Sequence, residues 1–153
     1  LTLPGGVTLG FADYAARYLF PDVRDRVEFT GILPPQRIAD LRRRAMLTVV
    51  SSRSESFSYA AVEAMAAASP VVATAWPGSA ELIRDGVTGW LTPVGMPDPL
   101  AERIGWVVDH PDVARRVGAA GWRQCRESYA PDRVARRSVD FYAEVVARHA
   151  AQR

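Results

Sequence analysis

Short segments rich in β-branched residues alternate with segments of helical spacing along the first two thirds of the sequence. The predicted strands are residues 27–30, 47–50, 71–74 and 90–92, with residues 1–3 as an earlier candidate. The predicted helices between them are residues 11–20, 36–45, 59–68 and 80–85. This order requires crossover connections and predicts a Rossmann-like α/β fold, a parallel sheet with helices on both faces. Residues 47–50 and 71–74 are apolar without alternation, so both faces of these strands are expected to be covered.

The last third of the sequence has helical spacing throughout. Its predicted helices are residues 99–109, 113–129 and 132–150. Asp98 is expected to cap the first of them, with Pro99 in the first turn. Pro111 and Pro131 mark the breaks between the helices.

The composition narrows the class of protein. The chain has 153 residues, 48% hydrophobic and 24% charged, which is typical of one globular domain. The net charge of +2 argues against a nucleic-acid partner, and no apolar run approaches the ~20 residues of a transmembrane segment. The single cysteine, Cys125, excludes an internal disulfide, and His110 and His149 lie outside the glycine-rich connections. Zinc hydrolases and Ser-His-Asp hydrolases are therefore disfavoured, no bound metal is implied, and a cytoplasmic location is expected.

Ligand sites in parallel sheets lie where the carboxyl ends of the strands run into helices. In this sequence those connections are residues 30–34, 51–58 and 75–81. None of them contains the Gly-x-Gly-x-x-Gly fingerprint, which disfavours a nicotinamide or flavin dehydrogenase. The serine-rich second connection leads into an alanine-rich helix, and this stretch carries the strongest functional signal.

Two glutamates, Glu55 and Glu63, flank the predicted start of this helix. If the helix begins near Ser58, Glu63 lies roughly 7–8 Å along its axis. The free N–H groups of Phe57, Ser58 and Tyr59 would then lie between the two carboxylates, where a phosphate can bind. With Glu55 at the sugar and Glu63 at the ribose, the arrangement fits a nucleotide sugar. The alternative is two solvated glutamates whose spacing of eight residues arose by chance.

Five motifs follow one another in a fixed order between Val27 and Gly89. They are Phe29-Thr30-Gly31, the loop of residues 51–58, Val62-Glu63-Ala64-Met65-Ala66, Pro70-Val71-Val72-Ala73-Thr74, and residues 77–89, which begin Pro77-Gly78-Ser79-Ala80-Glu81. Together they resemble the donor-binding half of retaining glycosyltransferases of the two-Rossmann-domain (GT-B) architecture, in the glycosyltransferase group 1 family. The resemblance implies transfer of a sugar from a nucleoside-diphosphate sugar to an acceptor hydroxyl with retention of configuration. It implies no permanently bound cofactor.

The resemblance also implies roles for individual residues. Glu55 is expected to be catalytic, because it orients the transferred sugar, and Glu63 to hold the ribose. The residues expected around the rest of the donor are Phe57, Ser58 and Tyr59 at the diphosphate, Gly31 and Ile32 at the nucleobase, and Glu81 as a third family glutamate. Arg53 either faces the phosphate or is a solvated loop cation, and Glu81 alternatively only stabilises the first turn of its helix.

The sequence departs from the family pattern at four positions. Ser56 and Ser58 replace the glycines that flank the phenylalanine, and Ala68 replaces the glycine after the helix. Pro77 replaces the first glycine of a pair and removes one amide donor. These changes are compatible with a different donor and also with weakened binding.

The start of the sequence resembles the middle of the family's second domain. Gly5-Gly6 is similar to the turn that lies inside that domain, so residues 1–153 are interpreted as an N-terminally incomplete donor-binding domain. The acceptor-binding domain, and the basic pair that the family places on the diphosphate, have no counterpart in the sequence.

The expected partners are a nucleotide sugar, an acceptor, and an N-terminal acceptor-binding domain or partner chain. The last predicted helix has an apolar side, formed by Val134, Val139, Phe141, Tyr142, Val145 and Val146, that the family's closing helix packs across the domain junction. Residues 42–44 are three arginines, interpreted as a solvated helix end, with a peripheral contact to an acidic membrane as the alternative.

Two other functions stay open. The serine and proline departures favour a non-catalytic nucleotide-binding or interaction module of the same fold. A different GT-B enzyme, such as a sugar-nucleotide epimerase, is disfavoured by the Glu-x₇-Glu spacing.

Overall fold

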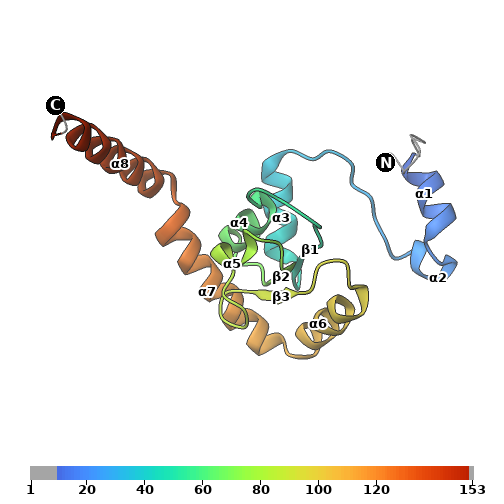
Figure 1. The fold of residues 1–153 in the computed structure, drawn as a ribbon. Helices are drawn as coiled ribbons and strands as arrows, with labels where there is room; N and C mark the ends of the chain where they lie inside the picture. The colour runs from blue at the N-terminus through green and yellow to red at the C-terminus, as the bar shows by residue number, and fades with distance from the viewer. Residues whose placement is uncertain (1–9, 152–153) are drawn as a thin grey trace. The chain divides into compact units, whose positions relative to one another are not determined.

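The computed structural model describes residues 10–151 and divides the chain into two compact units, residues 1–34 and residues 35–153 (Figure 1). The first unit contains α1 (Phe11–Tyr18) and α2 (Pro21–Arg24), of which only α1 was predicted. The Arg24 guanidinium donates to the carbonyl oxygens of Ala16 and Leu19, at 3.0 and 3.3 Å, and so holds α2 against the end of α1. The candidate strand at residues 1–3 and the turn at residues 5–6 lie outside the described residues.

The strand predicted at residues 27–30 is wrong. These residues form irregular backbone, and the side chains of Val27 and Phe29 are 39% and 52% exposed. β-branched and aromatic residues favour extended backbone, but a strand forms only where a neighbouring strand completes its hydrogen-bond ladder. The three strands that the structure describes, all in the second unit, pair with one another.

The second unit is built on a parallel sheet with helices on both faces (Figure 1). The strands β1 (Thr48–Val50), β2 (Val71–Thr74) and β3 (Trp90–Thr92) follow in that order, with Val49 opposite Val72 and Ala73 opposite Leu91. The helices are α3 (Pro35–Arg44), α4 (Tyr59–Ala66), α5 (Ser79–Leu82), α6 (Pro97–Asp109), α7 (Pro111–Tyr129) and α8 (Pro131–Ala151). The predicted α/β class and the three strands predicted in this unit are confirmed.

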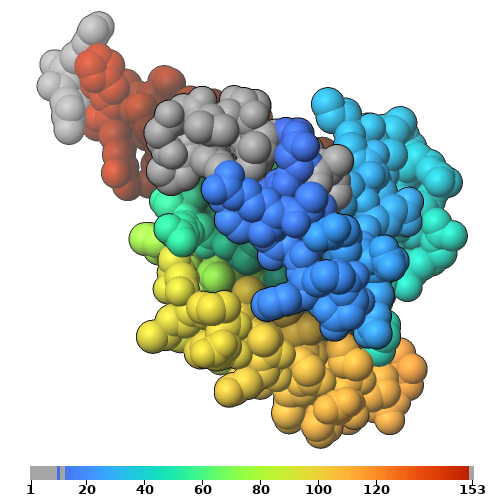
Figure 2. All heavy atoms as spheres, turned by 90° about the vertical axis from the view of Figure 1, so that its right-hand side faces the viewer, coloured from blue at the N-terminus to red at the C-terminus, as the bar shows by residue number. Residues whose placement is uncertain are grey.

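The side chains of β2 alternate between two hydrophobic cores, one on each face of the sheet. The core against α4 contains Val50, Ala64, Met65, Val71, Ala73, Trp76 and Cys125. The core against α6 contains Val72, Trp90, Val107, Ala114 and Val117. In Figure 2 the yellow atoms that follow β3 and the orange atoms of α6 and the beginning of α7 form one continuous surface.

The two apolar strands differ in burial, contrary to the prediction. β2 is central and all four of its residues are buried. β1 is an edge strand of the described sheet, and Val49 is 40% exposed. An apolar run of residues therefore does not distinguish a central strand from an edge strand.

α4 has defined caps at both ends. The hydroxyl of Ser58, the N-cap, accepts a hydrogen bond of 3.3 Å from the N–H of Ala61. At the other end, Ala68 N–H donates to Met65 and Ser69 N–H to Ala64, at 2.9 and 3.0 Å, which is the Schellman pattern. This motif requires a left-handed residue, so Ala68 has a φ of 56° where the family pattern has glycine. The conformation costs an alanine about 1 kcal/mol and ends α4 two residues before the predicted boundary.

α6 begins at Pro97 rather than after Asp98. Met96 is the N-cap and Pro97 the first helical residue, so Asp98 lies within the first turn instead of capping it. N–H groups of the first turn have no partner within a helix, and for that reason both Pro97 and Pro99 fit without losing a hydrogen bond.

α8 continues from the end of α7 and contributes no buried residue (Figure 1). Its apolar residues are exposed, from 44% for Val134 to 68% for Val146. Among residues 10–151, no helix is both long and apolar enough to cross a membrane.

A glycine of α7 makes the closest approach to the end of α4. A Cβ atom at Gly118 would lie 2.6 Å from the carbonyl oxygen of Ala68 and 3.2 Å from the nitrogen of Pro70. Both are backbone atoms, which move only if the helices shift. We expect Gly118→Ala to lower the free energy of unfolding by about 1–3 kcal/mol, measured by urea denaturation.

Gly105→Ala in α6 is the matched control, because nothing lies within 4 Å of a Cβ atom built there. This exposed substitution should raise the free energy of unfolding by about 1 kcal/mol through helix propensity alone. Equal stability of the two variants would contradict the close packing of α7 against α4.

Candidate functional site

The connections that follow β1 and β2 lie side by side at the carboxyl edge of the sheet. The hydroxyl of Thr74, at the end of β2, donates to the carbonyl oxygen of Ser52 and lies 3.3 Å from that of Val50. A Cβ atom at Gly78 would come within 3.5 Å of the carbonyl oxygen of Ser56. Open α/β sheets bind ligands at this edge.

Glu55 lies in the loop between β1 and α4 and is half-buried. The hydroxyl of Ser52 donates to its Oε1 atom. Ser52 is itself held to the end of β2 by the Thr74 hydroxyl. The Glu55 carboxylate is therefore tied to the edge of the sheet, and its Oε2 atom has no hydrogen-bond partner among the described residues.

The start of α4 presents backbone N–H groups close to Glu55. Ser58 is fully buried, with a φ of −89°, and its hydroxyl caps the helix. In the part of the chain that the structure describes, the N–H groups of Phe57, Ser58 and Tyr59 have no acceptor. Free N–H groups at the start of an eight-residue helix carry partial positive charge, to which an anion can bind.

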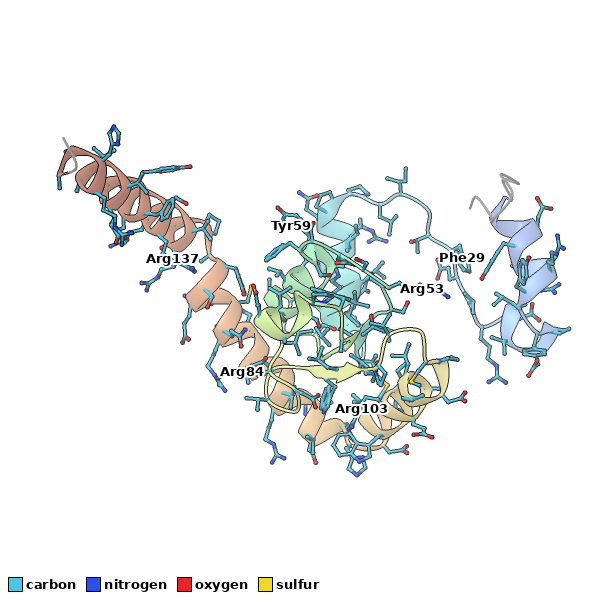
Figure 3. The ribbon with its side chains drawn as sticks, viewed as in Figure 1. Phe29, Arg53, Tyr59, Arg84, Arg103 and Arg137 are labelled. Atoms are coloured by element: carbon cyan, nitrogen blue, oxygen red, sulfur yellow. The ribbon has the colours of Figure 1, made fainter. Side chains whose placement is uncertain are left out.

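Glu63 lies on the exposed face of α4, one turn beyond Tyr59, which Figure 3 labels. Nη1 of Arg42, in the last turn of α3, donates to Oε2 of Glu63. The Arg42 side chain is only 16% exposed, so the interpretation of residues 42–44 as a solvated helix end is wrong for this arginine. The reason is that α3 packs beside α4 (Figure 1), which brings Arg42 within reach of Glu63.

A groove of about 840 Å³ opens between the start of α4 and the helices α7 and α8. Its apolar lining residues are Phe57, Tyr59, Val62, Tyr129, Val134, Phe141 and Tyr142. The ring of Phe57 packs edge-on against those of Tyr59 and Tyr129, with centroids 5.3 and 6.0 Å away. Burial raises the pKa of the Tyr129 hydroxyl, and the charge of Arg137 lowers it by a smaller amount. Glu81 is exposed in the first turn of α5 and does not line this groove.

The remaining predicted site residues are Gly31, Ile32 and Arg53. Gly31, with a φ of 62°, and the fully exposed Ile32 belong to the first unit. Arg53 is exposed on the loop after β1, where Figure 3 labels it, and has no hydrogen-bond or ion-pair partner among the described residues. Within residues 10–151 there is no group of His, Cys, Asp and Glu side chains that could hold a metal ion.

The side chains that hold the two glutamates were not predicted from the sequence. Thr74 ends an otherwise apolar buried strand, and a polar residue at that position was a usable signal. Ser52 is one serine among several in its loop, and nothing distinguished it. Arg42 is 21 residues before Glu63, too far apart for a local pattern to connect them.

The model of the glycosyl transferases group 1 family matches residues 16–124 of this chain. The chain belongs to this family. It is 36% identical over 140 residues to a D-inositol 3-phosphate glycosyltransferase of Streptomyces griseus, covering 92% of this chain and 29% of that protein. It is 38% identical over 131 residues to the enzyme of the same name from Salinispora tropica, covering 83% of this chain and 26% of that protein. The chain thus spans less than a third of the length of these curated relatives.

Solved structures share the fold of this group 1 chain. Sucrose-phosphate synthase from Thermosynechococcus elongatus has a TM-score of 0.79 and 28% identity, covering 88% of this chain and 33% of that one. Anabaena HepE, in complex with UDP-glucose, has a TM-score of 0.76 and 24% identity, covering 85% of this chain and 35% of that one. The family resemblance and the GT-B fold class predicted from the motifs are confirmed.

Proposed function

We propose that this chain holds the nucleoside-diphosphate sugar of a retaining glycosyltransferase, which transfers the sugar to an acceptor hydroxyl. The start of α4 carries the proposal, because its N–H groups, which have no acceptor among the described residues, follow Glu55 and precede Glu63 along the chain. A nucleotide sugar has the same order of groups, with an anionic diphosphate between two rings that bear hydroxyls. Membership of the group 1 family supports the same function.

In the proposed reaction, the bond between the anomeric carbon and a diphosphate oxygen breaks, and the acceptor oxygen bonds to that carbon on the same face. The proton of the acceptor hydroxyl passes to the departing phosphate oxygen. The N–H groups of Phe57, Ser58 and Tyr59 would stabilise the charge that develops on the diphosphate. Glu55, held by Ser52, would orient the sugar and stabilise positive charge at its anomeric carbon.

The remaining candidate residues are assigned to the other parts of the donor. Glu63 would accept hydrogen bonds from the ribose. Arg53, exposed and without a partner among the described residues, is available for the phosphate. Glu81, exposed in the first turn of α5, would lie on the sugar side.

We further propose that residues 1–153 act as a donor-binding domain together with an acceptor-binding domain or a partner chain. The chain covers 29% of its Streptomyces griseus relative, which leaves room in such a protein for a second domain. The exposed apolar side of α8 supports the same arrangement. HepE holds UDP-glucose, so a uridine-diphosphate sugar is the first donor to test.

A non-catalytic nucleotide-binding module is the second candidate, favoured by Ser56, Ser58 and Pro77 in place of glycines. The conformation of the loop weakens the case for this module. Of the described residues other than glycine, Ala68 alone has a positive φ, so neither serine occupies a conformation that needs glycine. Ser58 also supplies the N-cap of α4, which a glycine could not do with a side chain. Nucleotide binding without transfer, in a protein that has both domains, would support the module.

The chain is expected to bind a nucleoside diphosphate without added metal, because a helix N-terminus can neutralise the anion. Calorimetric titration with UDP, GDP and ADP, each with and without a chelator, tests this. The matched control is the nucleoside without its phosphates, which should bind at least about tenfold more weakly since it lacks the charged group. If none of the three diphosphates binds, the proposed function is wrong for this chain.

A further inference from the structure

Arg42 is the member of the run of three arginines that reaches another helix. The other two turn back onto α3, where Arg43 pairs with Asp40 and Nε of Arg44 donates to the carbonyl oxygen of Asp40 at 3.3 Å. Arg42 instead crosses to α4 and pairs with Glu63. Its side chain is 16% exposed, against 58% for Arg43, so Arg42 is the one packed between the helices.

The pairing fixes a side chain that would otherwise sample many conformations. Glu63 is on the exposed face of α4 and its side chain is 57% exposed. A glutamate in such a position has three rotatable side-chain bonds, whose freedom is lost when a ligand immobilises it. The guanidinium of Arg42 engages Oε2, which restricts these bonds before any ligand arrives.

The geometry of the pair also leaves the carboxylate able to bind a ligand. An ionised carboxylate has two oxygens and about four acceptor positions. Arg42 occupies Oε2 from the side of α3, so Oε1 and the second lone pair of Oε2 stay available for two hydroxyl donors. A ribose presents two such donors, its 2′ and 3′ hydroxyls, on adjacent carbons.

We propose that Arg42 is a positioning residue, which holds the carboxylate of Glu63 so that it accepts both ribose hydroxyls of the bound nucleotide. The proposal rests on the proposed function, because it takes Glu63 as the residue at the ribose. Its consequence is a preference for ribonucleotides over their deoxy forms that depends on the ion pair. The competing explanation is a cross-link that only stabilises the packing of α3 against α4. Such a cross-link would affect unfolding but not the preference between two ligands.

The experiment measures dissociation constants of the chain for UDP, 2′-deoxy-UDP and 3′-deoxy-UDP, with the GDP and ADP series in parallel. The wild-type chain is expected to prefer the ribose form about tenfold, the effect typical of losing a hydrogen bond to a charged group. Arg42→Ala should reduce this preference to about twofold to threefold, and Arg42→Lys, which keeps the charge, should restore most of it. Glu63→Gln should abolish the preference for the ribose form. The double variant, Arg42→Ala with Glu63→Gln, should have the same preference as Glu63→Gln alone.

Arg43→Ala is the matched control. It removes the same charge from the same turn of α3 and breaks an ion pair, but that pair lies within the helix. Its preference for ribonucleotides should equal that of the wild type. Circular dichroism is used to monitor thermal unfolding of every variant. It identifies any loss of ribonucleotide preference that results from a loss of folded structure.

The outcomes separate this inference from the proposed function. If Glu63→Gln loses the preference but Arg42→Ala keeps it, the positioning role is overturned and the proposed function stands. The positioning role is likewise overturned if Arg42→Ala changes only the unfolding temperature, or if Arg43→Ala has an equal effect. Failure of the wild-type chain to bind any of the diphosphates overturns both.

Discussion

Replacing Glu55 by Ala, in an active protein that contains this chain, is expected to lower kcat by about 100-fold to 1,000-fold. Ser52 holds the carboxylate at the edge of the sheet, where it would meet the transferred sugar rather than the nucleotide. Its interaction with positive charge at the anomeric carbon would be strongest in the transition state, so its loss appears in kcat. The dissociation constant for the free nucleoside diphosphate should change by less than about threefold, because that ligand lacks the sugar. Steady-state kinetics and calorimetry measure the two quantities.

Glu63→Ala is the matched comparison, since it removes the same functional group from the other side of the start of α4. It should weaken binding of the nucleoside diphosphate by about 1–3 kcal/mol, the cost of charge-assisted hydrogen bonds to the ribose. If the two variants have the same effect in both assays, the division of roles between Glu55 and Glu63 is wrong.

The 153-residue chain by itself is expected to transfer no sugar to any acceptor. Transfer requires the donor and the acceptor hydroxyl to be held together, and such orientation can supply about 7–11 kcal/mol of the barrier. The groove beside the start of α4 is open and α8 leaves its apolar side exposed, as expected if these residues supply only one wall of the proposed reaction site. Incubation with a panel of nucleotide sugars and acceptors, followed by mass spectrometry, detects any product.

A complete glycosyltransferase of the same family, assayed under the same conditions, is the positive control. Binding of the diphosphate should persist in the chain while transfer is absent, which would show that the donor site is formed. Transfer above background by the chain alone would falsify the role given to an acceptor-binding domain.

The prediction of the fold succeeded where local patterns determine structure. Short segments rich in β-branched residues mark the strands of the described sheet, helical spacing marks each long helix, and Ser58 and the prolines mark where helices begin. It failed at residues 27–30 and at Val49, where the outcome depends on which segment lies alongside. Residue type records the preference of a segment for extended backbone but not the presence of a neighbouring strand.

The prediction of the candidate site had a similar limit. Glu55 and Glu63 are predicted as site residues because their spacing relative to a helix start and the family motifs around them are patterns along the chain. Arg42 and Thr74, which act on those glutamates or on their loop, come from other elements and meet them only after α3 and β2 have packed. Thr74 left a signal, as the polar end of an apolar strand, but the contact between Arg42 and Glu63 leaves no trace in a single sequence.

The exposed position of β1 also bears on how the chain behaves in concentrated solution. The N–H of Thr48 donates to the carbonyl oxygen of Pro70, directly before β2, at a distance of 2.8 Å. Backbone groups of successive strand residues point to opposite sides, so the N–H and carbonyl groups of Val49 face the outer edge of the sheet. Proteins usually protect such an edge with charged residues or proline, but β1 consists of one threonine and two valines. An unprotected edge of this kind is a template for pairing with a strand of another molecule, so we expect the second unit by itself to associate through β1 as its concentration rises.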